Sequence, residues 1–200
     1  MATGAGRGEA GLRRAVAVVA LANLGFFGVE FAVALAIGSV ALFADSVDFL
    51  EDAAVNGLIL AGLGWGERAR ARLGMVLAAI LLVPAAATLW TAWQKVAVPV
   101  APAPLALSVT GLAALAVNLG CALLLARFRH HAGSLTRAAF LSARNDALAN
   151  VAIIAAGLVT ALLWRSAWPD LLVGLGIAAL NADAAREVWT AARREHRAAA

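Results

Sequence analysis

The chain has 200 residues, of which 63% are hydrophobic and only 14% are charged, and its mean hydropathy is +0.86. This composition excludes a soluble globular domain, because a small soluble protein needs a far more polar surface. Since a membrane-spanning helix takes about 20 apolar residues, the hydrophobic content suffices for roughly six spans. It leaves no room for a soluble catalytic domain, so we expect no enzyme. The net charge of +4 is attributed to a basic membrane face and not to nucleic-acid binding.

Apolar runs separated by charges and turn residues predict an all-α membrane protein with six transmembrane helices. The breaks between the runs contain Gly, Pro or clustered charges, which are typical of turns. We expect a cytoplasmic tail over 1–14, a six-helix domain over 15–190 and a short cytoplasmic tail over 191–200. Gly25, Gly28 and Gly57 are expected where helices pack closely. In chain order the predicted helices are 15–37, 39–63, 74–95, 105–127, 136–163 and 169–190.

The distribution of basic residues predicts the orientation of these helices. With the N-terminus placed inside, both termini are cytoplasmic and only Lys95 and Arg165 fall outside. Cytoplasmic loops carry the excess of Lys and Arg in membrane proteins, so the bias supports this orientation. We therefore expect a multi-pass protein of the inner (plasma) membrane. The cytoplasmic set is Arg7, Arg13, Arg14, Arg68, Arg70, Arg72, Arg127, Arg129, Arg137, Arg186, Arg193, Arg194 and Arg197.

The second predicted helix carries four acidic residues inside a membrane span. At 100° per residue, Asp45, Asp48 and Asp52 fall within about 60° of one another. Glu51 lies about 100° from Asp52 and is expected to point elsewhere. On the fifth predicted helix, Asp146 follows Ser142 by one turn.

Depth brings these acids together near the middle of the bilayer. Asp48 and Asp52 lie about 13–20 Å below the outer surface, and Asp146 about 15 Å above the inner one. A charge at that depth costs at least roughly 2.5–3.5 kcal/mol, and neighbouring carboxylates also repel. Arg144 alone cannot neutralise three acids. Carboxylate oxygens on two facing helices would instead make a hard, oxygen-rich site for a divalent cation.

A faint internal repeat points to the same residues. DAAVNGLIL at 52–60 resembles DALANVAII at 146–154, and NLG at 23–25 recurs at 118–120. Three helices per repeat would invert the two halves relative to each other. Inverted repeats place a transported ion at the midplane, between corresponding helices.

From about residue 15 to 185, the sequence resembles the cation diffusion facilitator family of divalent metal exporters. SVALFADSVDFLED is similar to the family's second-helix motif, with Asp48 and Asp52 at its ligand positions and Asp45 at the preceding Asp. Asp146 matches the Asp ligand of the fifth helix, and RND before ALAN is similar to short bacterial members.

The resemblance implies export of a metal ion from the cytoplasm in exchange for protons, and a homodimer. It implies no cofactor beyond the transported divalent ion, with zinc expected first and cobalt, cadmium, nickel, iron or manganese as alternatives.

Two features depart from the family pattern. Ser142 stands where the family has His or Asp and is a weak ligand, so water, Asn145 or Asn150 would have to complete the shell. The chain also ends about ten residues after the sixth predicted helix, so the family's cytoplasmic domain is expected to be missing.

Two other interpretations stay open. A proton-coupled exporter of small organic cations would place aromatic side chains beside the acids, where only Phe43 and Phe49 are near. A membrane scaffold subunit without transport activity would explain six helices but not a cluster of acids at the midplane.

Overall fold

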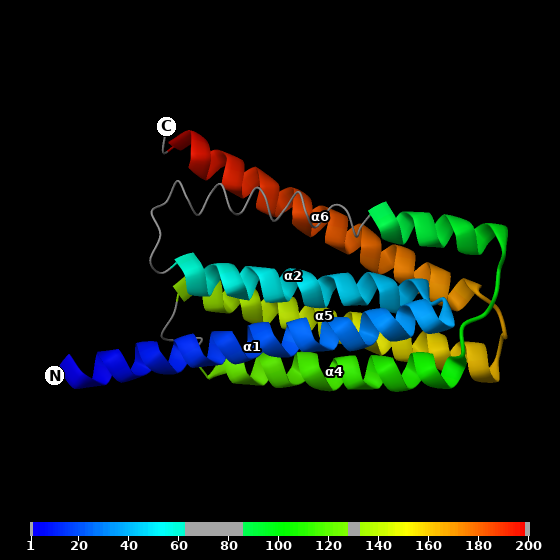
Figure 1. The fold of residues 1–200 in the computed structure, drawn as a ribbon, viewed down its shortest axis with the longest axis horizontal. Coiled ribbons are helices and arrows are strands. Elements are labelled where there is room, and N and C mark those ends of the chain that lie inside the picture. The colour runs from blue at the N-terminus through cyan, green and yellow to red at the C-terminus, as the bar shows by residue number, and fades with distance from the viewer. Residues whose placement is uncertain (1, 63–85, 128–132, 199–200) are drawn as a thin grey trace.

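The computed structural model describes residues 2–62, 86–127 and 133–198. Within these ranges the chain is helical, without strands, and the helices lie side by side along one long axis (Figure 1). Both chain ends lie at one end of the bundle, as the predicted topology requires (Figure 1). A further helical segment covers 86–97. The long helices are α1 (Ala2–Ile37), α2 (Val40–Gly62), α4 (Pro104–Ala126), α5 (Gly133–Leu162) and α6 (Trp168–Ala198).

The helices start and end close to the predicted positions except at the two termini. Helix α1 begins at Ala2 instead of 15, and α6 continues to Ala198 instead of 190. The predicted boundaries followed the arginines, which indicate where the apolar stretch ends but do not stop a helix. The predicted loop 64–73 and the first part of the predicted helix 74–95 lie outside the described residues.

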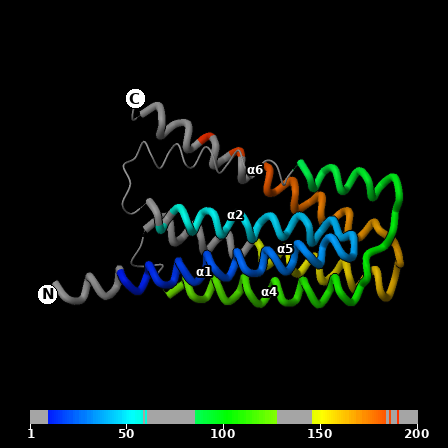
Figure 2. Tube along the Cα trace, in the orientation of Figure 1, coloured from blue at the N-terminus to red at the C-terminus, as the bar shows by residue number. Residues whose placement is uncertain are grey.

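The described helices pack in two close pairs, and α6 packs against one member of each pair. Helix α1 packs along α2 and α4 along α5, while α6 packs against α2 and α5 (Figure 2). A Cβ at Gly111 or Gly157 would collide with the facing helix of the α4–α5 pair, and one at Gly174 would collide with the backbone of Val40. No described neighbour lies within 4 Å of a Cβ placed at Gly25, Gly28 or Gly57, so the described part of the chain does not support close helix packing at these three glycines.

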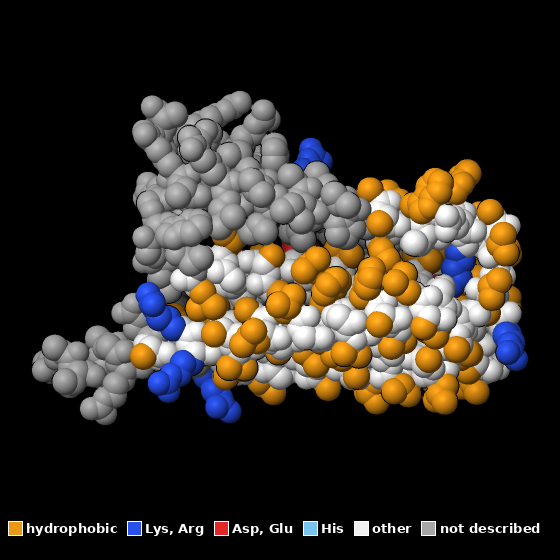
Figure 3. Space-filling model, viewed as in Figure 1, with side chains coloured by type: hydrophobic (Ala, Val, Ile, Leu, Met, Phe, Trp, Pro, Cys, Tyr) orange, Lys and Arg blue, Asp and Glu red, His pale blue; other side chains and the backbone are white. Residues whose placement is uncertain are grey.

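Many large hydrophobic side chains are exposed on the described surface of the bundle, and several polar side chains are buried inside it. Hydrophobic side chains cover its long side, with Lys and Arg mainly at its ends (Figure 3). Inside, Asn23, Glu30 and Asp45 are fully buried. By length and composition, two described segments could cross a membrane, Ala10–Ile37 and Pro104–Ala126. Helix α2 carries four acids, so its apolar character is interrupted at the site described next.

Candidate functional site

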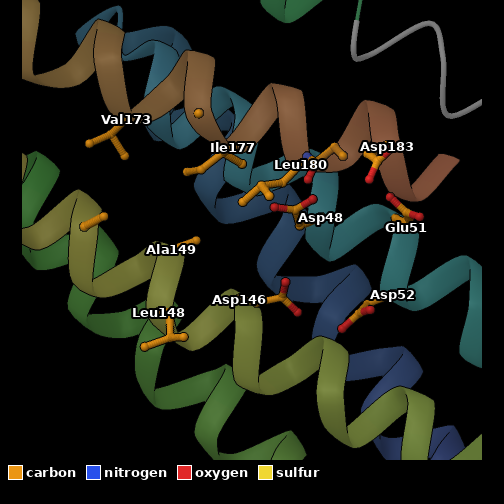
Figure 4. Close-up of a pocket in the computed structure, with 13 residues that line it drawn as sticks. Asp48, Glu51, Asp52, Asp146, Leu148, Ala149, Val173, Ile177, Leu180 and Asp183 are labelled. Atoms are coloured by element: carbon orange, nitrogen blue, oxygen red, sulfur yellow. The ribbon is translucent and has the colours of Figure 1, made fainter. Parts of the chain in front are cut away.

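A cavity of about 700 Å³ lies between α2, α5 and α6. Its polar lining is almost entirely acidic, with carboxylates from all three helices (Figure 4). Alanine, valine, isoleucine and leucine side chains, with Gly176 and Asn181, make up the rest of the described lining. The acids are Asp48, Glu51 and Asp52 of α2, Asp146 of α5 and Asp183 of α6.

The three aspartates expected as ligands all line this cavity. Asp48 and Asp52 are one turn apart on α2, so both side chains project from the same side of the helix. Asp146 projects from α5 toward α2, across the cavity (Figure 4). The cavity therefore combines carboxylates from two antiparallel helices, as the sequence predicts.

The acidic side chains line the cavity but do not converge on a single position for an ion. In the described part of the chain, no three Asp, Glu, His or Cys side chains are gathered closely enough to hold a metal ion. This arrangement can attract a cation and offer it oxygen ligands one at a time. To enclose the ion, the helices would have to move closer together or water would have to fill the remaining positions.

Two acids of the lining were not expected from the sequence. The prediction that Glu51 points away was wrong, because its side chain faces the cavity together with Asp48 and Asp52. The cavity face of α2 is centred on Asp48, and Glu51 lies within about 60° of that residue. Asp183, in the part of α6 that continues toward the C-terminus, lies opposite Glu51 (Figure 4). The run of alanines around Asp183 gave no indication of a site.

Asp45 and Asn150 were expected to support the site, and neither is part of the cavity lining. Asp45 is fully buried on another side of α2, where Asn150 Nδ2 donates to its Oδ1 at 3.3 Å. The same amide lies 2.6 Å from the carbonyl oxygen of Asp146. Asn150 therefore links Asp45 to the backbone of the cavity residue Asp146. As a direct ligand in the cavity it is not supported, because its side chain lies elsewhere.

The side-chain amide of Asn23, on α1, contacts the carboxylate of Asp52. Its Nδ2 lies 3.4 Å from Asp52 Oδ2, and Cys121 Sγ lies 3.8 Å from Asn23 Oδ1. Asn56 Nδ2 donates to the Asp52 carbonyl at 2.8 Å, as Asn150 does to Asp146. The repeated D-x-x-x-N pattern is thus accompanied by the same local hydrogen bond on both helices. Asn23 is the first residue of the repeated NLG segment, which is the only feature of the sequence that pointed to it.

The remaining expected residues cannot be placed in the cavity. Ser142, Arg144 and Asn145 belong to the backbone of α5, but their side chains lie outside what the structure describes. The aromatic residues Phe43 and Phe49 do not line the cavity. They pack against Phe31 and Phe26 of α1, at ring-centroid distances of 5.4 and 4.9 Å.

A second polar cluster fixes the opposite end of α2. Asp170 accepts hydrogen bonds from Ser39 Oγ at 2.5 Å, Val40 N at 2.9 Å and Ala41 N at 3.2 Å. Lys95 Nζ lies 3.0 Å from Asp170 Oδ2 and also donates to the carbonyl of Gly38. Gly38 has φ 62°, a left-handed conformation that glycine adopts readily. A carboxylate at the first N–H groups of a helix stabilises that end.

Comparison with known families identifies the chain over most of its length. The model of the cation efflux transmembrane domain matches residues 16–194. This range includes every described residue that lines the cavity. Comparison with curated proteins found no match.

Proposed function

The chain belongs to the cation efflux family, also called cation diffusion facilitators, and from this premise we propose that it exports a divalent transition-metal ion from the cytoplasm. Members of this family are membrane transporters and not enzymes. Zinc is the first expected cargo, followed by cobalt, cadmium, nickel, iron and manganese. The observation that carries the proposal is the cavity whose described polar lining is almost entirely carboxylate.

Asp48, Asp52 and Asp146 are the proposed ligands. Zinc binds Asp oxygens at about 2.0–2.2 Å, usually with four ligands. Three aspartates supply three of these positions, and water or Ser142 would supply the fourth. Because the donors are all oxygen, such a site would accept several divalent ions with little discrimination.

Glu51 and Asp183 would act earlier, by raising the local concentration of cations at the cavity. Both line it, and Asp183 belongs to the half of α6 that runs toward the C-terminus. Acidic side chains in a cleft with low-dielectric walls focus the electric field and attract cations. The predicted orientation puts this end of the bundle in the cytoplasm, which is the side from which an exporter loads.

Exchange with protons fits the same carboxylates. Ionised aspartates would take the metal from the inside, and protons from the outside would displace it after the helices move. A protonated site can return through the membrane without carrying bare charge. We further propose a homodimer in the inner (plasma) membrane, as the family resemblance implies.

An exporter of small organic cations is the second candidate. The described cavity lining contains no aromatic side chain, although such cations are commonly bound over aromatic faces. This observation favours the metal. The interpretation as a scaffold without transport activity does not explain why carboxylates face a cavity inside the bundle.

Thermal stabilisation by ligands separates these candidates. The purified protein in detergent is heated with Zn²⁺, Co²⁺, Mn²⁺ or a quaternary ammonium ion, and its unfolding temperature is recorded. We expect the divalent ions to raise that temperature, because a ligand that binds only the folded state stabilises it. Asp52→Asn should abolish the shift, and Glu67→Gln, in the predicted loop, should keep it. A shift with the ammonium ion alone would support the organic-cation exporter.

A further inference from the structure

Asn181 of α6 is the uncharged polar residue of the described cavity lining. Between Asp170 and Asn181, α6 consists of apolar residues and glycine. A polar side chain within a membrane-spanning stretch is costly unless it has polar partners, and such residues commonly mark the pathways of transported ions. The partners of this amide therefore indicate what it does in the cavity.

A hydrogen bond to α2 places the amide of Asn181 beside Asp48. Asn181 Nδ2 lies 3.5 Å from the carbonyl oxygen of Ala44. In an α-helix that carbonyl also accepts the N–H of the residue four positions on, which is Asp48. Side chains of a helix lean toward its N-terminus, so the carboxylate of Asp48 covers the turn that begins at Ala44. Asn181 and Asp48 therefore border the same part of the cavity.

The contact with Ala44 uses the nitrogen of the amide and leaves its oxygen available to a ligand in the cavity. That oxygen is an acceptor with two lone pairs. The side chain of Asn181 is half-buried, as expected for a group at a cavity wall. Asp183 leaves α6 about 160° around the helix from Asn181, so the two side chains do not serve the same point.

A neutral oxygen suits this position chemically. Asp48, Asp52 and Asp146 already bring three carboxylates to the cavity, and a further carboxylate beside them would add repulsion. Amide and carbonyl oxygens are common ligands of hard divalent cations and add no charge to the site. Asn181 can therefore supply a ligand from a third helix without increasing the negative charge.

We infer that the side-chain oxygen of Asn181 is a ligand of the transported divalent ion and binds it together with Asp48. It takes a position that water would otherwise fill, so that α2, α5 and α6 all contribute to the cation site. The inference rests on the proposed function, because it requires a cation in the cavity. It adds α6 to the two helices from which the sequence predicts the ligands.

Titration of the purified full-length protein with Co²⁺ tests whether this oxygen binds the ion. Asn181→Leu removes both polar atoms of the amide, whereas Asn181→Asp keeps an oxygen and loses the donor to Ala44. We expect Asn181→Leu to weaken Co²⁺ binding by about tenfold or more, since the loss of groups that merely orient a metal ligand already costs that much. Asn181→Asp should bind Co²⁺ at least as tightly as the wild type.

The comparison of these two variants separates a ligand from a structural residue. Equal losses of Co²⁺ affinity in Asn181→Leu and Asn181→Asp would show that the amide only joins α6 to α2, which contradicts the inference. Unchanged affinity in Asn181→Leu would overturn it as well.

The absorption spectrum of bound Co²⁺ gives a signature that a structural role would not change. Its visible bands move when a nitrogen ligand replaces an oxygen ligand, so Asn181→His should shift them and raise the affinity for Zn²⁺ relative to Mn²⁺. Ala182→His is the matched control, because residue 182 is exposed and is not part of the cavity lining. The control should show the wild-type bands, and identical bands in Asn181→His would overturn the inference.

Binding and transport are measured separately, so that the two proposals can fail separately. If the wild type binds Co²⁺ but does not transport it in proteoliposomes, export is refuted and the titration still decides the role of Asn181. If transport requires Asp146 while every Asn181 variant binds Co²⁺ as the wild type does, export stands and the ligand assignment fails. A wild type that binds no divalent ion would overturn both.

Discussion

Lys95 Nζ lies 3.0 Å from Asp170 Oδ2, and both side chains are buried at the end of the bundle where α2 begins. The ion pair joins the helical segment 86–97 to α6, while Asp170 also caps the first turn of α2. Helix α2 provides three of the cavity's acids. The ion pair therefore anchors the first turn of α2, and α2 carries the proposed ligands Asp48 and Asp52 near the middle of its length.

Loss of either partner should destabilise the fold, and loss of Asp170 should do so more. Removing one member of a buried ion pair costs about 3–5 kcal/mol, because the other charge is left uncompensated. Asp170→Asn also weakens the cap on Val40 and Ala41, which adds about 0.5–2 kcal/mol. The comparison of Asp170→Asn with Lys95→Met is made by unfolding in detergent.

The double variant provides the control for this interpretation. Lys95→Met combined with Asp170→Asn should lose less stability than the sum of the single changes, because no buried charge is left alone. Additive losses would show that the two residues act independently.

Asn23 is expected to tune the affinity for the cation through Asp52. The contact is long, at 3.4 Å, so we expect Asn23→Ala to weaken metal binding by about 1 kcal/mol, or roughly fivefold. Asn56→Ala, which affects the carbonyl and not the carboxylate of Asp52, should leave the affinity nearly unchanged. Titration calorimetry with Zn²⁺ measures both variants, and an equal loss in the two would exclude a specific effect on the carboxylate.

Glu51 and Asp183 should affect the loading of the cation more than its movement. Glu51→Gln or Asp183→Asn should raise KM several-fold, and the maximal rate should stay close to that of the wild type. The KM increase should diminish at high salt, because long-range attraction is screened within about 10 Å at 0.1 M ionic strength. A lower maximal rate with unchanged KM would place either residue among the ligands instead.

A prediction about metal selectivity follows from the position of Ser142 in the sequence. It precedes Asp146 by one turn of α5, so a longer side chain would project toward the same ion. Ser142→His should add an imidazole, tighten zinc binding and raise the ratio of zinc to manganese transport. Competitive uptake of the two ions measures that ratio. An unchanged ratio in an active Ser142→His protein would show that residue 142 does not face the ion.

The sequence predicts the cavity acids because two strong constraints act on them. Membrane depth and helical spacing together put Asp48, Asp52 and Asp146 at one level. Rotation about the helix axis was less well determined. The sequence prediction centred the site-facing side of α2 near Asp52, which placed Glu51 away from the site. In the structure the side of α2 that lines the cavity is centred on Asp48, so Glu51 is included.

Contacts between distant parts of the chain could not be read from local patterns. Asp170 lies in the first turn of α6, where an acidic residue is favourable in any helix, so nothing near it in sequence indicates Lys95 as its partner. The burial of Glu30 and Asp45 likewise depends on the packing of α1 along α2 and not on the residues next to them in sequence. The early start of α1 at Ala2 was missed because a helix can continue beyond the membrane boundary that the arginines indicate.

Zinc uptake into inside-out membrane vesicles with an acidic interior tests the central claim most directly. The wild type and Glu67→Gln should accumulate zinc, and accumulation should collapse when the pH gradient is dissipated. Asp146→Asn should be present and folded in the membrane but accumulate none, since it lacks one of the proposed ligands. Accumulation by Asp146→Asn at the wild-type rate would contradict a cation site shared between α2 and α5.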